Sequence, residues 1–273
     1  MALIQVNYLS MALFRTVPVN VILPVDKFNF DGTPAPDARP YKTLYLLHGL
    51  LGNYTDWVTG TRIQRWAEER NLAVVMPSGD NAFYIDRPAA KNCYGEFVGR
   101  ELVEMTRRMF PLSDRREDTF IAGLSMGGYG AIRNGLKYSD TFGCVAGLSS
   151  ALHMFDENDD PPIMDYDALG MGPLEKTRDS DMNPRVLIER LEKSKKPMPK
   201  IYLACGTEDG LLESNRAYRD LFRDAGFDLT YYEGPGGHEW DFWDDQIRRV
   251  LDWLPLKDAG QGVNSGNVGL DER

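Results

Sequence analysis

A serine with a glycine two positions away on either side is the residue whose setting most clearly indicates chemistry. Gly123, Ser125 and Gly127 follow the pattern Gly-x-Ser-x-Gly between an apolar run, 120–124, and a predicted helix, 126–138. At such a strand-to-helix turn the serine sits in strained backbone, and only small residues fit two places before and after it. The positive end of the helix points at the serine and suits a developing oxyanion. The pattern predicts that Ser125 is a nucleophile.

A serine hydroxyl becomes a good nucleophile when a base removes its proton, and histidine is the usual base near neutral pH. The chain has three histidines. His238 lies in a glycine-rich loop between the last predicted strand and the last predicted helix, which suits the base of a triad in the order Ser…Asp…His. For His48, at a strand end, we expect a structural hydrogen bond. His153 lies in a long insertion, where we expect it to face solvent or substrate.

The acid of such a triad holds the imidazole in the correct tautomer and stabilises its charged form. The loop after the preceding predicted strand contains two carboxylates, Glu208 and Asp209. Either could reach the histidine from this loop. We prefer Asp209 and keep Glu208 as the alternative.

An oxyanion also needs two preorganised N–H donors. The turn at Ser125 places one of them on Met126. The second is expected from the loop after His48, where we prefer the N–H of Leu50 and keep Leu51 as the alternative.

The elements that must position these residues alternate along the chain. Residues 2–25 predict two or three antiparallel strands. The predicted strands then cover 43–47, 72–76, 120–124, 142–148, 200–205 and 228–233, and the predicted helices cover 62–70, 96–110, 126–138, 184–193, 211–225 and 239–254. This alternation implies an α/β fold with a doubly wound, mostly parallel sheet and helices on both faces. Ligands in such sheets bind beyond the carboxyl ends of the strands, where the residues singled out above lie.

The expected organisation is a single domain over residues 1–255, with a small lid insertion at about 150–199. Residues 256–273 are rich in Gly, Asn and Asp and are expected to form a disordered tail.

The composition excludes several classes of partner. A net charge of −10 argues against nucleic acid and against an anionic membrane. The N-terminus lacks the pattern of a signal peptide and no apolar run is long enough to span a bilayer, so a cytoplasmic location is expected. No histidine pair has metal-ligand spacing, and no loop is typical of calcium or phosphate binding, so we expect neither a metal nor a cofactor. A homo-oligomer is left open.

With these residues established, the chain resembles the esterase D branch of the α/β-hydrolases. That branch includes tributyrin, feruloyl and acetylxylan esterases, S-formylglutathione hydrolases and the antigen 85 acyltransferases. The resemblance covers about residues 8–254 and is carried by the segments LLHGLLGNYTDW (46–57), VMPSGDNAFY (75–84), FIAGLSMGGYG (120–130) and GTED (206–209).

The resemblance implies an α/β-hydrolase fold and a set of site residues. By position it implies Ser125 as nucleophile, Asp209 as acid, His238 as base, and the N–H groups of Leu50 and Met126 as oxyanion donors. S-formylglutathione hydrolases carry a Thr-Cys pair after the Gly-Leu of the oxyanion loop. Here Leu51-Gly52 follows, which disfavours that activity.

The resulting hypothesis is a carboxylesterase that acts on a small-molecule ester through an acyl-enzyme. An acyltransferase and an S-formylglutathione hydrolase of the same family are the alternatives. A non-catalytic binding module is disfavoured, because a complete set of Ser, Asp and His candidates occurs in the right order.

The acyl group is less well defined by the sequence. Trp57, Phe83, Tyr84 and Trp240 flank predicted strand ends and could line a pocket for a feruloyl or other aryl ester. Aromatic residues at such positions also occur in cores, and we prefer a short aliphatic acyl group.

Overall fold

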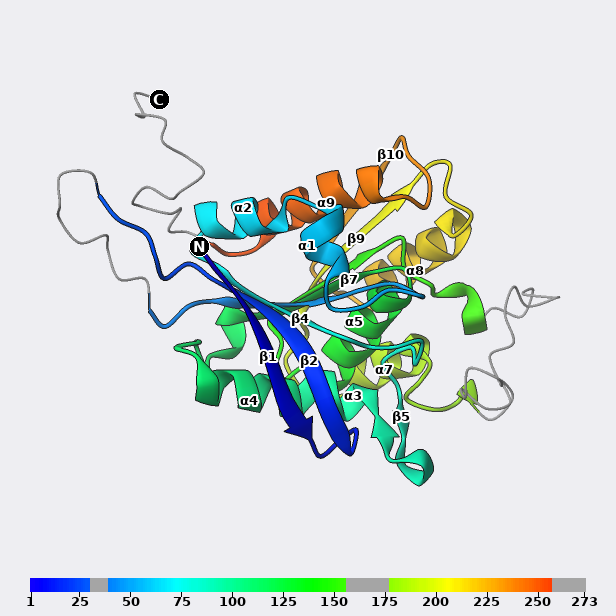
Figure 1. The fold of residues 1–273 in the computed structure, drawn as a ribbon. Helices are drawn as coiled ribbons and strands as arrows, with labels where there is room; N and C mark the ends of the chain where they lie inside the picture. Colours follow the sequence, from blue (N-terminus) through cyan, green and yellow to red (C-terminus); the bar gives the residue numbers. More distant parts are fainter. Residues whose placement is uncertain (30–38, 156–176, 257–273) are drawn as a thin grey trace.

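The structure is a computed structural model that describes residues 1–29, 39–155 and 177–256 (Figure 1). Its described strands include eight in one sheet, in the order β1-β2-β4-β3-β7-β8-β9-β10. β1 and β2 form an antiparallel hairpin and β2 runs antiparallel to β4, whereas the other neighbours are parallel. The strands are β1 (Ala2–Ser10), β2 (Arg15–Leu23), β3 (Thr43–Leu47), β4 (Ala73–Pro77), β7 (Thr119–Leu124), β8 (Cys144–Leu148), β9 (Lys200–Gly206) and β10 (Leu229–Gly234). The predicted doubly wound, mostly parallel sheet is confirmed, and residues 2–25 form two strands.

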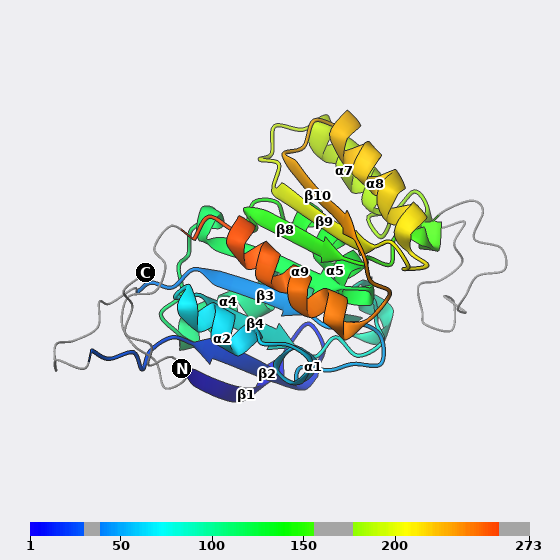
Figure 2. The same ribbon diagram turned by 90° about the horizontal axis from the view of Figure 1, so that it is seen from above.

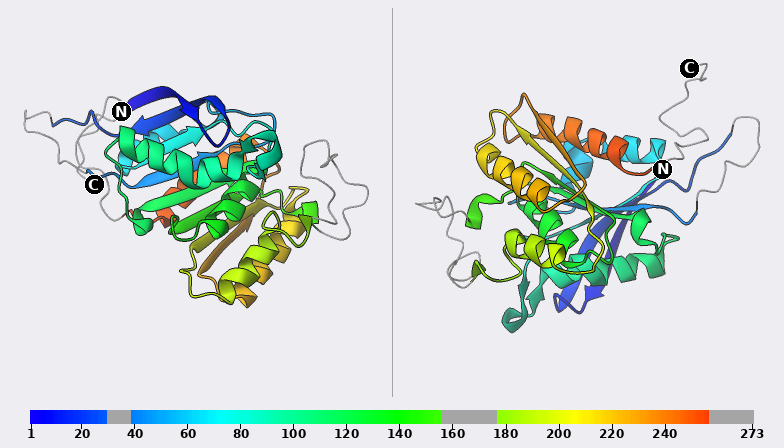
Figure 3. Two further views of the ribbon diagram at one scale, coloured as in Figure 1. Left: turned by 90° about the horizontal axis from the view of Figure 1, so that it is seen from below. Right: turned by 180° about the vertical axis from the view of Figure 1, so that it is seen from behind.

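Helices cover both faces of this sheet (Figures 2 and 3). One face packs against α1 (Asp56–Gly60), α2 (Ile63–Glu69) and α9 (Trp240–Trp253). The other face packs against α4 (Leu102–Met109), α5 (Met126–Lys137), α7 (Pro184–Glu192) and α8 (Leu212–Asp224). Every residue of β3, β4, β7 and β8 is buried, as expected for central parallel strands covered on both sides.

The predicted helix over 96–110 differs from the observed one. α3 (Tyr94–Glu96) leads into a π-helical stretch, Phe97–Glu101, before α4 begins. The carboxylate of Glu101, at the end of the stretch, accepts hydrogen bonds from Ser10 Oγ and from the N–H groups of Met11 and Ala12. It thereby ties the turn of the β1–β2 hairpin to this helix.

The lid insertion expected over about 150–199 stays a prediction, and its described helix, α7, packs into the core. In α7, Leu187, Ile188 and Leu191 are buried in the same core as the inner face of α5, because the helix turns an apolar stripe toward it. Residues 156–176 lie outside the described residues, as does the predicted tail beyond Leu256. The single domain over 1–255 stays a prediction.

Two further sequence expectations concern membranes and metals. None of the helices in the described ranges combines the length and apolar character that crossing a bilayer requires. In the same part of the chain, no group of three or more His, Cys, Asp or Glu side chains is arranged to hold a metal ion.

Candidate active site

Three side chains that are far apart in the sequence meet at the carboxyl edge of the sheet. Ser125 follows β7, Asp209 follows β9 and His238 follows β10. His238 Nε2 lies 3.0 Å from Ser125 Oγ, and His238 Nδ1 lies 2.9 Å from Asp209 Oδ2. The hydroxyl, imidazole and carboxylate therefore form one hydrogen-bonded chain. Such a chain can draw a proton from the hydroxyl and hold the resulting positive charge.

The turn that carries Ser125 is strained, as the glycine pattern predicts. Ser125 has φ 53° and ψ −118°, a region that a residue with a side chain rarely adopts. Its N–H donates to Leu148 O (2.9 Å), and its carbonyl accepts from the N–H groups of Tyr129 and Ala151 (both 3.0 Å). These bonds anchor the turn to β8 and to α5, so the hydroxyl is presented by rigid elements.

Gly127 stands where the turn touches the oxyanion loop. A Cβ at this position would lie 2.4 Å from His48 O and 2.5 Å from Leu47 O, and neither backbone atom can move aside cheaply. We expect Gly127→Ala to lower the free energy of unfolding by about 1–3 kcal/mol and to reduce esterase turnover. Urea unfolding and p-nitrophenyl acetate hydrolysis measure the two effects. Gly210→Ala is the matched control for the free energy of unfolding, since a Cβ there meets nothing within 4 Å; equal stability of the two variants would contradict the prediction.

The structure brings Asp209, and not Glu208, to the histidine. Asp209 is 5% exposed, and its Oδ1 accepts from Leu211 N–H at 2.9 Å. Burial by itself would raise the pKa of Asp209, but hydrogen bonds from His238, Leu211 N–H and the Ser149 hydroxyl outweigh it and hold the pKa below its usual value. Glu208 is exposed, and its carboxylate accepts from Gly236 N–H.

The structure also distinguishes between the two candidate oxyanion donors, the N–H groups of Leu50 and Leu51. Leu51 N–H donates to Asn81 Oδ1 at 2.8 Å and is therefore engaged. Leu50 and Met126 line the same hollow as Ser125 and His238. Their position at the hollow suits an oxyanion on the acylated serine.

His48 holds this loop in place through two hydrogen bonds, which agrees with the structural role expected from the sequence. Its Nε2 accepts from Gly79 N–H (2.7 Å), so its Nδ1 carries the proton and donates to Gly49 O (2.6 Å). Burial lowers the pKa of His48, partly offset by the hydrogen bond to Gly49. A neutral ring is what this pattern needs, because a protonated Nε2 could not accept from Gly79.

Two hollows meet at Ser125 and His238. The first has a volume of about 270 Å³ and is lined by Leu50, Phe83, Ser125, Met126, Ala151, His153, Asp209, Gly210, Leu211 and His238. The second has a volume of about 650 Å³ and is lined by Gly49, Leu50, Leu51, Gly52, Asp56, Leu124, Ser125, His238, Glu239, Trp240 and Trp243.

Of the four aromatic residues expected at a substrate pocket, Phe83 and Trp240 line these hollows. Trp57 and Tyr84 are buried and line neither of these hollows. Trp57 Nε1 donates to Leu47 O (3.0 Å) and Tyr84 OH donates to His48 O (3.0 Å). Both rings thus support the end of β3 and its loop from inside the protein, because a buried polar ring atom needs a hydrogen-bond partner.

Sequence reasoning missed several residues that line the hollows. Leu211 lies two positions after Asp209, and Glu239 and Trp243 follow His238 closely. Their proximity to the proposed acid and base in the chain was the available signal. Asp56 carried no such signal, since it reaches the second hollow only because α1 folds back over β3.

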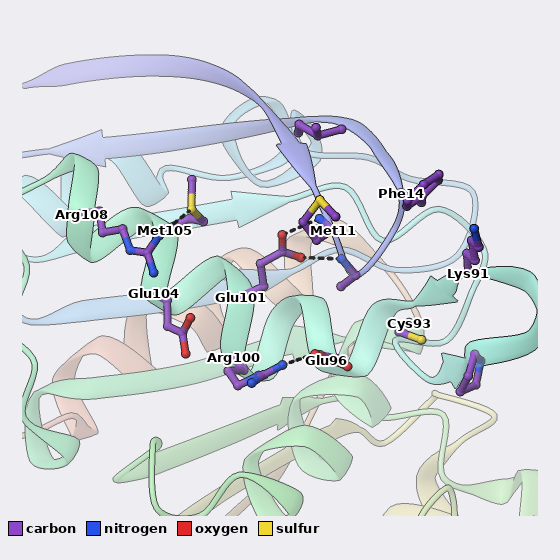
Figure 4. A pocket seen from close by; sticks show the side chains of 13 residues that line it. Met11, Phe14, Lys91, Cys93, Glu96, Arg100, Glu101, Glu104, Met105 and Arg108 are labelled. Atoms are coloured by element: carbon purple, nitrogen blue, oxygen red, sulfur yellow. Dashed lines mark hydrogen bonds and ion pairs between the residues drawn. The ribbon is translucent and has the colours of Figure 1, made fainter.

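A separate hollow of about 590 Å³ lies between the β1–β2 hairpin and α4 (Figure 4). In this hollow the Glu101 carboxylate is already hydrogen-bonded to the turn of the hairpin, and Arg100 forms an ion pair with Glu96. Burial raises the pKa of the Cys93 thiol there, which keeps it in its unreactive form. Cys93 is therefore not an activated nucleophile, whereas Ser125 has the His238 base beside it.

The mostly parallel sheet with a serine on a strained strand-to-helix turn, and with an acid and a histidine after two later strands, defines an α/β-hydrolase. Known proteins agree with this class. The chain matches the putative esterase family over residues 10–254. It is 42% identical over 261 residues to an acetyl esterase of Caldicellulosiruptor saccharolyticus, covering 93% of this chain and 98% of that protein.

Two solved structures from Staphylococcus aureus are also similar. An S-formylglutathione hydrolase has a TM-score of 0.80 at 33% identity, covering 93% of this chain and 98% of that one. FphF, a fluorophosphonate-binding serine hydrolase with substrate bound, has a TM-score of 0.81 at 32% identity, covering 94% and 99%. The chain belongs to the putative esterase family and is a carboxylic ester hydrolase, so the resemblance to the esterase D branch is confirmed.

Proposed function

We propose that this chain is a serine carboxylesterase that removes short acyl groups from uncharged alcohols. Ser125 is the nucleophile, His238 the base, Asp209 the acid, and the N–H groups of Leu50 and Met126 bind the oxyanion. The observation that carries the proposal is the unbroken hydrogen-bonded chain from Ser125 Oγ to His238 (3.0 Å) and from His238 to Asp209 (2.9 Å).

The reaction follows from this arrangement. Ser125 Oγ bonds to the ester carbonyl carbon while His238 Nε2 takes the hydroxyl proton, and the carbonyl oxygen becomes an oxyanion held by two N–H groups. The bond to the alcohol oxygen then breaks, and His238 returns its proton to that oxygen. A water molecule attacks the acyl-enzyme in the same way, which releases the acid and restores the hydroxyl of Ser125.

We assign the smaller hollow to the acyl group. Its walls include the apolar side chains of Leu50, Phe83, Met126 and Leu211, and its volume is about 270 Å³. An apolar pocket of this size suits a short acyl chain. The 42% identity to an acetyl esterase supports the same choice.

We assign the larger hollow to the alcohol. It contains two carboxylates, Asp56 and Glu239, which pair with no basic side chain among the residues that the structure describes. Of the described residues that line the two hollows, none is lysine or arginine. Anionic alcohols or thiols are therefore repelled from this side of the site, whereas neutral ones are not.

The second candidate is S-formylglutathione hydrolysis, which the 33% identity to such an enzyme favours. Glutathione is anionic, and the carboxylates in the larger hollow oppose it. A matched pair of acetyl thioesters separates the two functions, with S-acetylglutathione as the anionic thioester and S-acetyl-N-acetylcysteamine as the neutral one.

We expect kcat/KM to be roughly 10-fold higher for the neutral thioester, and Glu239→Gln to narrow this ratio. Among p-nitrophenyl esters, acetate and butyrate should exceed octanoate and ethyl ferulate should be poor. A preference for S-acetylglutathione over the neutral thioester would replace the proposal with the second candidate. Ester product instead of free acid in the presence of glycerol would indicate an acyltransferase.

A further inference from the structure

Ser149 is a second serine in strained backbone at this edge of the sheet. It directly follows β8, the neighbour of the strand that precedes Ser125, and it has φ 44°. Its side chain is fully buried, and its N–H donates to Ala204 O at 2.7 Å. A glycine would adopt this φ without strain. Strain of this kind persists only where the surroundings enforce it, and it often marks a functional site.

Trp243, in the first turn of α9, contacts both Ser149 and the proposed base. Its Nε1–H donates to Ser149 Oγ at 3.1 Å. Its ring meets the His238 ring edge-on, with centroids 4.9 Å apart and planes at 90°. One side chain therefore supports the imidazole and orients a buried hydroxyl.

Two more indole rings hold Trp243 in position. Trp240 packs edge-on against Trp243 at 5.3 Å between centroids, and Trp57 packs edge-on against Trp240 at 5.6 Å. Since Trp57 Nε1 is bonded to Leu47 O, the row of rings is fixed to the end of β3. Trp243 thus has little freedom to rotate away from the histidine.

The hydroxyl of Ser149 has a single proton to donate. Because its oxygen accepts from Trp243, that proton points elsewhere, and the neighbouring groups whose pKa this hydroxyl helps to lower are the Asp209 carboxylate and the Cys205 thiol. Asp209 also accepts from Leu211 N–H and His238. Direct contacts therefore run from Ser149 to Trp243, from Trp243 to His238 and from His238 to Asp209.

We propose that Ser149 and Trp243 are positioning residues, which hold the Asp209 carboxylate and the His238 imidazole in line with Ser125. The inference rests on the proposed catalytic roles of Ser125, His238 and Asp209. Ser149 lines neither hollow, so its effect on the reaction is exerted through Trp243 and Asp209. A carboxylate that is hydrogen-bonded to His238 and Leu211 N–H cannot rotate freely, and small misplacements of a base are costly for the rate.

A double-mutant cycle tests the proposal. Ser149→Ala should lower kcat for p-nitrophenyl acetate about 10-fold with KM changed less than about 2-fold, since it misplaces the base without touching substrate. Trp243→Phe keeps an aromatic ring beside His238 but removes the N–H together with part of the indole, and it should lower kcat roughly 3-fold. Because both changes act through one hydrogen bond, the double variant should match Ser149→Ala alone. Fully multiplicative losses would overturn the proposal.

Three further measurements separate positioning from a structural role. Ser149→Gly relieves the backbone strain, so an equal loss of kcat in the Gly and Ala variants assigns the effect to the hydroxyl. Loss of a donor raises the pKa of Asp209, so the acid limb of the pH profile should move to higher pH in both variants. Trp253→Phe is the matched control on the same helix; its ring lies against Tyr202 and should leave kcat unchanged.

Wild-type kcat in both Ser149 variants would overturn the inference. Wild-type turnover and covalent labelling of Ser125 by a fluorophosphonate report separately on the proposed function. A wild-type enzyme that is labelled and active, combined with fully active Ser149 variants, would therefore remove only the positioning roles.

Discussion

Ser125→Ala should lower kcat for p-nitrophenyl acetate by roughly 10⁴–10⁶-fold while the protein remains folded. The loss is large because no acyl-enzyme can form without the hydroxyl, and the residual rate then comes from oxyanion binding and substrate orientation alone. The Ser125 side chain makes no capping hydrogen bond to α5, and the backbone bonds of the turn are unaffected by removal of Oγ. Thermal unfolding and far-UV circular dichroism should match those of the wild-type protein.

The matched control for this variant is Ser113→Ala. Ser113 is buried, and its Oγ donates to Asp118 Oδ2 at 2.8 Å, away from both hollows. It should retain turnover and covalent labelling by a fluorophosphonate, whereas Ser125→Ala should lose both. Wild-type kcat in Ser125→Ala would remove the assignment of the nucleophile and with it the proposed mechanism.

Asp209→Asn should lower kcat by roughly 10⁴-fold, and Glu208→Gln should change it less than about 2-fold. An amide at position 209 can present an N–H to His238 Nδ1, which favours the tautomer with its proton on Nε2. That tautomer cannot accept the proton of Ser125 Oγ, although the 3.0 Å approach is preserved. Glu208 is exposed and bonds to the Gly236 N–H, so its charge is dispensable for the base.

The stability of the same two variants gives an independent readout. The pKa of Asp209 is lowered in the folded protein, so its ionised form adds stability above the unfolded-state value of about 3.9. This stability is lost as the pH falls through the lower, folded-state pKa. Asp209→Asn should therefore reduce the dependence of the unfolding temperature on pH below about 4. Equal losses of kcat in Asp209→Asn and Glu208→Gln would mean that the two carboxylates share the role of the acid.

Much of the fold follows from local patterns. The apolar run that predicts a strand at 43–47 coincides with β3, and the predicted 126–138 helix differs from α5 by one residue at its end. A strand covered on both faces must be apolar throughout, and a helix bounded by a Ser turn and a later polar stretch has clear limits. The π-helical stretch at Phe97–Glu101 escaped this reasoning, because one extra residue in a turn scarcely alters hydrophobic periodicity.

The candidate site likewise contains residues that the sequence identifies and choices that the sequence leaves open. Ser125 and His238 were identified because the chemistry requires particular residue types at particular points of an alternating chain. The choices that remained open were Glu208 against Asp209 and Leu50 against Leu51. Neighbouring residues share the same loop and the same composition, so only the direction of each side chain or N–H separates them.

The sequence by itself determined the order of strands and helices, the turn at Ser125 and the kind of chemistry at the sheet edge, since these depend on residues close together in the chain. Only the tertiary structure decided which groups meet. It turned Asp209 toward His238, engaged Leu51 N–H with Asn81, buried Trp57 and Tyr84 beneath the oxyanion loop, and set Trp243 between Ser149 and the histidine. The physical reason is that such contacts depend on side-chain direction between elements far apart in the chain, and neither periodicity nor residue type specifies that direction.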